Sequence, residues 1–245
     1  MHAPILAAAA LAFATLLPIT PARAEPAEPA ATPAGRTIVF GVDRSDTWER
    51  MTRIGMALAE QTLLHDLRPG DEIVYRWISD RSYAADQAFA QVRLPVLLAA
   101  KGQLDHRGKQ EAARTRQALI TAARQGQTQL RRFTPEASSA NPGLDLRNGT
   151  KSTDLIGFLT AAAEQFAQTD ASRPRLLIIV SDLEDNRRFP VKPNLAGVEV
   201  VVYSVSLRAD PAKGQQLQKQ WTQFFTQSGA RVVEFRPAMV IPEPG

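Results

Sequence analysis

The chain of 245 residues predicts an α/β fold with a doubly wound, mostly parallel central sheet and helices on both faces, as in Rossmann-like domains. Apolar, β-branched runs alternate with segments of helical periodicity, which is typical of β-α-β units and a parallel sheet. The run from Arg175 to Val180 is apolar on both faces, as a central parallel strand requires. Polar residues follow two of these runs, at the sheet edge where α/β proteins bind ligands.

The first half of the domain should begin with a strand and a helix. Thr37 to Val42 is the expected first strand, and a helix should run from Asp46 or Thr47 to His65, because its apolar residues recur at roughly 3.6 spacing. The turn residues 68–71 separate this helix from a second strand, Glu72 to Ser79.

The middle of the chain is less regular. Residues Ser82 to Ala100 are predicted as a helix broken at Pro95, Lys109 to Arg132 as a second helix, and Phe133 to Asn148 as a loop rich in proline and serine. We expect the region of about 81–147 to be a long, basic, helical insertion in the domain.

Regular structure returns in the last third of the chain. The expected helices and strands alternate here as they do at the start, which completes the doubly wound pattern. They are a helix over Thr153–Gln168, a strand over Arg175–Val180, a strand over Val198–Val205, a helix over Pro211–Ser228 and a strand over Arg231–Phe235.

The N-terminus has the pattern of a secretory signal peptide over 1–24. An apolar run, Ile5 to Leu17, precedes a small-x-small cleavage site that ends at Ala24. Such a chain would be periplasmic or secreted, with no transmembrane segment once mature. No Lys or Arg precedes the apolar run, so an uncleaved membrane anchor is the alternative.

The remaining boundaries follow from composition. Residues 25–36 form a flexible Pro/Ala linker, 37–236 the folded domain and 237–245 a loose tail. The chain has no cysteine, which excludes disulfides, zinc-thiolate sites, cysteine nucleophiles and a lipid anchor after the signal peptide.

Positive charge is concentrated in one segment. Between Arg81 and Arg147 there are 11 Lys or Arg and 5 Asp or Glu, a balance of +6, whereas the whole chain carries only +4. A basic face attracts acidic partners or anionic headgroups. A solvated helix surface without a partner is the other interpretation.

Three separated pieces of sequence predict a metal site at the carboxyl edge of the sheet. Asp43, Ser45 and Thr47 follow the first strand at alternate positions, Thr153 opens the middle helix, and Asp182 ends the strongest strand. Two carboxylates and three hydroxyls form an all-oxygen set, which suits Mg²⁺, Mn²⁺ or Ca²⁺ rather than zinc.

With these motifs the sequence resembles a von Willebrand factor type A (VWA) domain with a metal-ion-dependent adhesion site (MIDAS). The family pattern Asp-x-Ser-x-Ser is matched by residues 43–47, with Thr47 in the last place. Its distant threonine is matched by Thr153, with Thr150 as the rival, and its late aspartate by Asp182. Leu183 stands where glycine is common in the family. The family also has a short antiparallel edge strand, and no segment of this sequence is assigned to that strand.

The resemblance implies recognition through a bound ion. Ser45, Thr47 and Thr153 would bind it, Asp43 and Asp182 would do so directly or through water, and a partner protein would supply an Asp or Glu carboxylate at the open position. Neither an enzyme activity nor a nucleic-acid partner is expected. The rim around the ion would decide which partner fits. Its predicted members are Arg44, Asp46, Asp154, Glu184 and Asp185.

Other interpretations of these residues remain open. Asp43, Ser45 and Asp46 are also preferred helix-capping residues. The domain could lack a metal and bind through its basic insertion instead. A metal-dependent phosphoryl hydrolase with Asp43 as nucleophile is the enzymatic alternative, but Ser45 stands where that chemistry needs a second carboxylate.

Overall fold

A computed structural model of the chain describes residues 35–44, 48–96, 106–134, 152–184, 192–204 and 211–237. The chain divides into two units, 1–31 and 32–245, and every described residue belongs to the second. Within the described ranges no helix is both long enough and apolar enough to span a bilayer. The predicted signal peptide, most of the linker and the tail beyond Pro237 lie outside these ranges.

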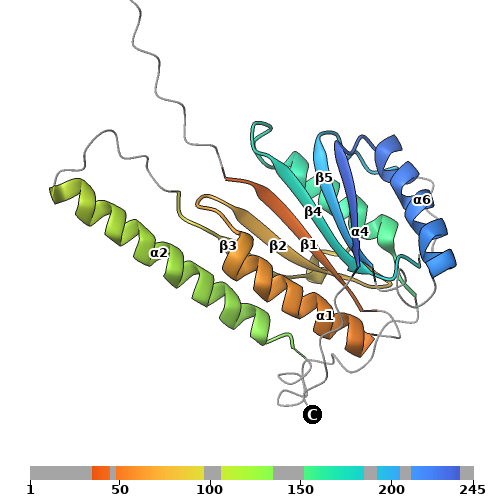
Figure 1. The fold of residues 1–245 in the computed structure, drawn as a ribbon, viewed down its shortest axis with the longest axis horizontal. Coiled ribbons are helices and arrows are strands. Elements are labelled where there is room, and N and C mark those ends of the chain that lie inside the picture. Colours follow the sequence, from red (N-terminus) through yellow and green to blue (C-terminus); the bar gives the residue numbers. More distant parts are fainter. Residues whose placement is uncertain are drawn as a thin grey trace, which may run out of the picture. The chain divides into compact units, whose positions relative to one another are not determined.

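One six-stranded sheet organises the described part of the chain (Figure 1). The strand order is β3-β2-β1-β4-β5-β6, and every neighbouring pair is parallel except β2 and β3. From β1 the sheet extends to one side through β2 and β3 and to the other through β4, β5 and β6, so its switch point lies between β1 and β4, as in doubly wound folds. The strands are β1 Thr37–Asp43, β2 Glu72–Ile78, β3 Ala88–Arg93, β4 Arg175–Ser181, β5 Val198–Ser204 and β6 Val232–Pro237.

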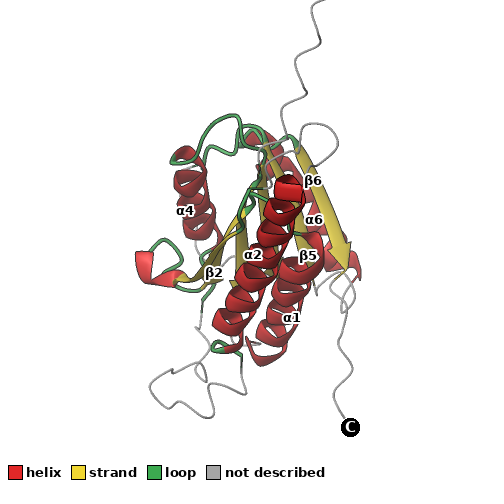
Figure 2. Ribbon diagram, turned by 90° about the vertical axis from the view of Figure 1, so that its left-hand side faces the viewer, coloured by secondary structure: helices red, strands yellow, loops and turns green. Residues whose placement is uncertain are grey.

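Helices cover both faces of this sheet. On one face α1 and α2 lie side by side, and α4 and α6 pack on the opposite face (Figures 1 and 2). The helices are α1 Trp48–Gln61, extended by a π-helical turn η1 Thr62–Asp66, α2 His106–Arg131, α4 Leu155–Ala167 and α6 Pro211–Gln227. The predicted fold class is therefore confirmed.

Alternation along each strand divides the interior into two cores. In β1, Ile38, Phe40 and Val42 face α1, whereas Val39 faces α4. The β4 strand does the same, with Ile178 and Val180 on the first face and the buried residues at 177 and 179 on the second. Because both faces are apolar, these strands read as continuous hydrophobic runs in the sequence.

The helix predicted over Ser82–Ala100 is wrong for its central part, which is the edge strand β3. A short 3₁₀ turn, η2 Ala85–Gln87, precedes it, and then Ala90 and Val92 are buried while their neighbours Gln91 and Arg93 are exposed. This period of two is the signature of a strand with one covered face. Strand β3 runs antiparallel to β2 and lies at the edge of the sheet.

Helix α2 is one of the helices that cover the first core. Its second half packs there through Leu119, Ala122 and Leu130, and Phe133 follows just beyond its end. The region of about 81–147 is therefore not helical throughout, because it supplies both an edge strand and a covering helix.

Candidate functional site

The candidate site lies where three neighbouring parallel strands end. Asp43 is the last residue of β1 and pairs in register with Ile78, the last residue of β2. On the other side of β1, strand β4 ends at Ser181. Parallel neighbours bring their carboxyl ends to the same edge, so the topology gathers Asp43, Ser181 and Asp182 there.

Asp43 is completely buried, and its carboxylate is held by a residue from β4. The Ser181 hydroxyl donates a hydrogen bond to Asp43 Oδ2 at 2.6 Å, a length typical of bonds to a charged oxygen. The same Ser181 Oγ accepts from the Leu183 backbone N–H at 2.9 Å. One hydroxyl thus fixes the β1 acid and begins the turn that follows β4.

That turn holds an unusual backbone conformation at Leu183. Leu183 has φ +66°, and it is the one non-glycine residue with positive φ in the described part of the chain. Its carbonyl accepts from the buried Trp221 Nε1 at 3.0 Å, and its side chain is 2% exposed. Left-handed conformations of branched residues persist only where the surroundings enforce them, and they gather at functional sites.

Asp182 lies within this turn. Its Oδ1 accepts from the Glu184 N–H at 2.9 Å, which fixes the side chain against its own loop. Burial raises the pKa of the Asp182 carboxyl, opposed by that hydrogen bond and by the charge of Lys213. A cation placed here would offset the cost of burying the ionised form.

Thr153 reaches the same edge through the start of α4. The Asp154 N–H donates to the carbonyl of Ser79, the residue after β2, at 2.9 Å, and Thr153 is 1% exposed. Asp154 itself is the N-cap of α4, since its carboxylate accepts from the Gly157 N–H at 2.7 Å. Asp154 is 3% exposed, and its predicted place on the rim stays a prediction beside this capping role.

Two further residues of the predicted rim, Arg44 and Glu184, lie within the described ranges. The Arg44 guanidinium lies 5.3 Å from the centre of the Trp77 ring, whose face belongs to the first core, so Arg44 turns away from the side of the sheet that Asp43 faces. Glu184 is exposed, as a rim residue should be. Ser45, Thr47, Asp46, Asp185 and the rival Thr150 lie outside the described residues, so their predictions stay predictions.

Lys213 is a charged neighbour that sequence reasoning missed. It lies in the first turn of α6, and its ammonium contacts the Glu184 carboxylate at 2.5 Å. Its position in the sequence could have indicated this place. Lys213 stands two residues after Pro211, at the start of a crossover helix, and such helices begin at the carboxyl edge of the sheet. Lys213 therefore adds a positive charge beside Asp182 and Glu184.

The described donors fit a hard divalent cation. Asp43, Thr153 and Asp182 offer only oxygen atoms, and two of them are carboxylates whose burial favours a compensating positive charge. Among the described residues no three His, Asp or Glu side chains gather into a metal-binding group. A site of this kind would need hydroxyl ligands, and Ser45 and Thr47 are the further hydroxyls in the predicted motif.

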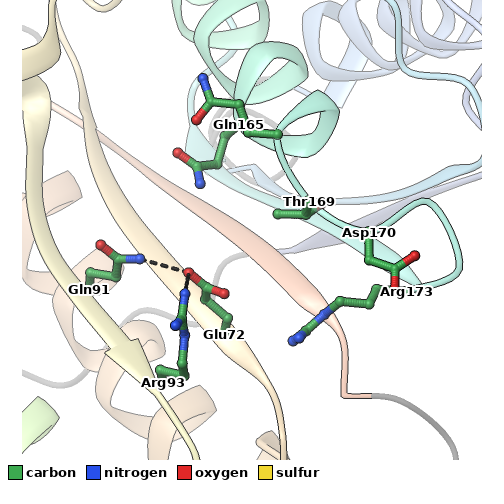
Figure 3. Close-up of a pocket in the computed structure, with 8 residues that line it drawn as sticks. Glu72, Gln91, Arg93, Gln165, Thr169, Asp170 and Arg173 are labelled. Carbon is green, nitrogen blue, oxygen red and sulfur yellow. Dashed lines mark hydrogen bonds and ion pairs between the residues drawn. The ribbon is translucent and has the colours of Figure 1, made fainter.

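A separate polar hollow lies at the opposite, amino edge of the sheet (Figure 3). Its volume is about 510 Å³, and Glu72 on its wall accepts from Gln91 at 2.7 Å and from Arg93 at 2.9 Å. Its charged groups are two acids and two arginines, which largely balance. The lining residues are Glu72, Gln91, Arg93, Gln165, Gln168, Thr169, Asp170 and Arg173.

Comparison with known proteins finds distant structural likenesses only. No protein-family model matches the chain, and no curated protein matches it. A solved structure described as the ArnB paralog VWA2 from Sulfolobus acidocaldarius is 13% identical with a TM-score of 0.36; the match covers 70% of this chain and 35% of that one, about a third of its length.

A second solved structure is an aerotolerance-related membrane protein from Bacteroides fragilis NCTC 9343 that carries multiple mutations to serines. It is 14% identical, with a TM-score of 0.39, and the match covers 82% of this chain and 91% of that chain. At these values neither likeness carries an argument about function.

Proposed function

We propose that the chain is a protein-binding module that docks a partner through a divalent cation at the carboxyl edge of its sheet. Asp43, Ser45, Thr47, Thr153 and Asp182 would hold the ion, with Mg²⁺ preferred and Mn²⁺ or Ca²⁺ as substitutes. The observation that carries the proposal is the buried Asp43 carboxylate, fixed by Ser181 at 2.6 Å beside the strained turn that contains Asp182.

The bound ion would present an open position to an acidic side chain. Hydroxyl ligands leave much of the charge of a divalent ion uncompensated, so a carboxylate from a partner protein is the preferred additional ligand. The exposed Glu184 and its ion-pair partner Lys213 would border that position and help to select the partner. We further propose that the chain is exported and acts in the periplasm or outside the cell, as residues 1–24 predict.

Calorimetric titration tests the proposal. Wild-type protein, starting at Glu25 so that both cores are retained, should bind Mg²⁺ and Mn²⁺ in the micromolar-to-millimolar range, and Asp43→Ala should abolish the heat. Asp66→Ala is the matched control, because Asp66 is an exposed acid at the end of η1. Absence of binding by the wild type, with and without millimolar acetate as a carboxylate surrogate, would overturn the proposal.

The phosphoryl-hydrolase alternative is tested in parallel with a generic aryl phosphate. The proposed function expects no turnover above the Asp43→Ala background with either metal. Metal-dependent hydrolysis that disappears in this variant would show that the chain is an enzyme rather than a binding module.

A further inference from the structure

Helix α2 is strongly basic. It contains six Lys or Arg residues and a single acid, Glu111, over His106–Arg131. Like charges on one helix repel one another, which slightly destabilises it unless acids nearby compensate.

Of the six bases of α2, only Arg131 has an acidic partner among the described residues, since its guanidinium pairs with Glu60 at 3.0 Å. The five other bases of α2 are all exposed, and within the described ranges none makes an ion pair or a side-chain hydrogen bond. These five are Arg107, Lys109, Arg114, Arg116 and Arg124.

Four of these bases lie in the half of α2 that does not build the core. We call residues 106–118 the basic arm. The α2 residues that pack on the first core begin at Leu119, and Figure 1 shows the N-terminal end of α2 extending past the end of α1. Core packing therefore does not explain the sequence of the arm.

We propose that the basic arm is a docking surface for an acidic protein surface. Three of its four bases are Arg, whose planar guanidinium binds carboxylates through paired hydrogen bonds. The arm contains no Leu, Ile, Phe or Trp, the residues with which surface-bound helices enter a bilayer. Carboxylates on a folded or extended partner therefore fit the arm better than a lipid surface does.

The docking is independent of the metal site, because the arm belongs to α2 and the proposed ligands lie on β1, β4 and the start of α4. Poly-L-glutamate of about 50 residues is the probe, with binding measured by fluorescence anisotropy on the chain from Glu25 at two salt concentrations. The test variant is the double substitution Arg107→Gln with Arg114→Gln. The matched control is Lys192→Gln with Lys219→Gln, which removes the same charge from exposed positions elsewhere.

The arm variant should bind the probe about tenfold more weakly, since each exposed ion pair contributes up to about a fivefold change in affinity. The control should change less than twofold, and EDTA or Asp43→Ala should have no effect. Equal losses in the two double variants would overturn the proposal, because attraction would then follow net charge alone. Binding to vesicles of anionic phosphatidylglycerol but not to poly-L-glutamate would also overturn it, in favour of a membrane surface.

Discussion

Ser181 and Asp43, 138 residues apart in the chain, are joined by a buried hydrogen bond of 2.6 Å from the hydroxyl to the carboxylate. The same oxygen receives the Leu183 N–H at 2.9 Å. Ser181 is fully buried, so no water replaces either partner if the hydroxyl is removed. One side chain therefore contacts both the β1 acid and the turn after β4.

Ser181→Ala should lower the free energy of unfolding by about 1–3 kcal/mol, because it removes one hydrogen bond from a buried carboxylate and one from a buried amide. Urea denaturation measures this change. The proposed metal affinity should fall as well, since the carboxylate would no longer be held in place. Ser181→Thr, which keeps the hydroxyl, should recover most of the affinity.

Thr52 supplies a matched control for that substitution. It is 1% exposed, and its hydroxyl has no hydrogen-bond partner among the described residues. Thr52→Val should therefore leave stability unchanged or raise it, since an unsatisfied polar atom is replaced by a methyl group. Equal destabilisation by the two substitutions would show that the Ser181 bond has no special role.

Leu183 offers a test of backbone strain through the order of two substitutions. Both Leu183→Ala and Leu183→Gly remove a side chain that is 2% exposed, which costs about 2–5 kcal/mol. At most sites glycine is the worse of the two by roughly 0.5–1 kcal/mol. At φ +66° glycine relieves strain, so Leu183→Gly should be no less stable than Leu183→Ala in chemical denaturation. The usual order, with alanine clearly better, would show that the turn is unstrained.

Much of the fold could be predicted from the sequence because β1 and β4 contribute buried residues to both cores and read as nearly continuous apolar runs. The edge strand β3 was missed, since Ala88–Arg93 is short, has one covered face and contains two alanines and one glutamine. Its strand character depends on pairing with β2, a contact between distant segments that local periodicity does not contain.

For the candidate site, the sequence predicts which residues follow the strands but not the contacts that support them. The end of each strand could be located, which placed Asp43 and Asp182 at one edge. The supporting contacts of Ser181, Trp221 and Lys213 come from side-chain directions across three elements, and sequence spacing does not encode them. The N-cap role of Asp154 follows from the orphan N–H groups at the start of α4, one of which its carboxylate accepts.

Glu72 predicts a specific pH dependence of stability. Although burial raises the pKa of Glu72, hydrogen bonds from Arg93 and Gln91 and the nearby guanidinium charges outweigh it, so the pKa lies below its ordinary value of 4.5. The folded state therefore gains stability above pH 4.5, and this gain is lost as the pH falls through the lowered pKa.

Glu72→Gln should accordingly reduce stability at pH 7 by up to about 1 kcal/mol, and the difference from wild type should shrink toward pH 3. Thermal melts across that range measure it. Glu111→Gln, an exposed acid on α2, is the control and should show no such convergence. A deficit that stays constant with pH would mean that Glu72 acts through packing rather than charge.

Gly41 in the middle of β1 sets how closely α4 approaches the sheet, and α4 in turn follows directly on Thr153. A Cβ at position 41 would lie 2.4 Å from Cζ and 2.8 Å from Cε2 of the buried Phe158 ring. Gly41→Ala should therefore destabilise the protein by about 1–3 kcal/mol through overpacking.

Phe158→Leu alone should also destabilise the protein, by leaving a cavity. Together the two changes should cost less than their sum by about 1 kcal/mol or more in a double-mutant cycle followed by urea denaturation. Additive losses would place the clash elsewhere, and Gly41 would then not determine the distance between α4 and the sheet.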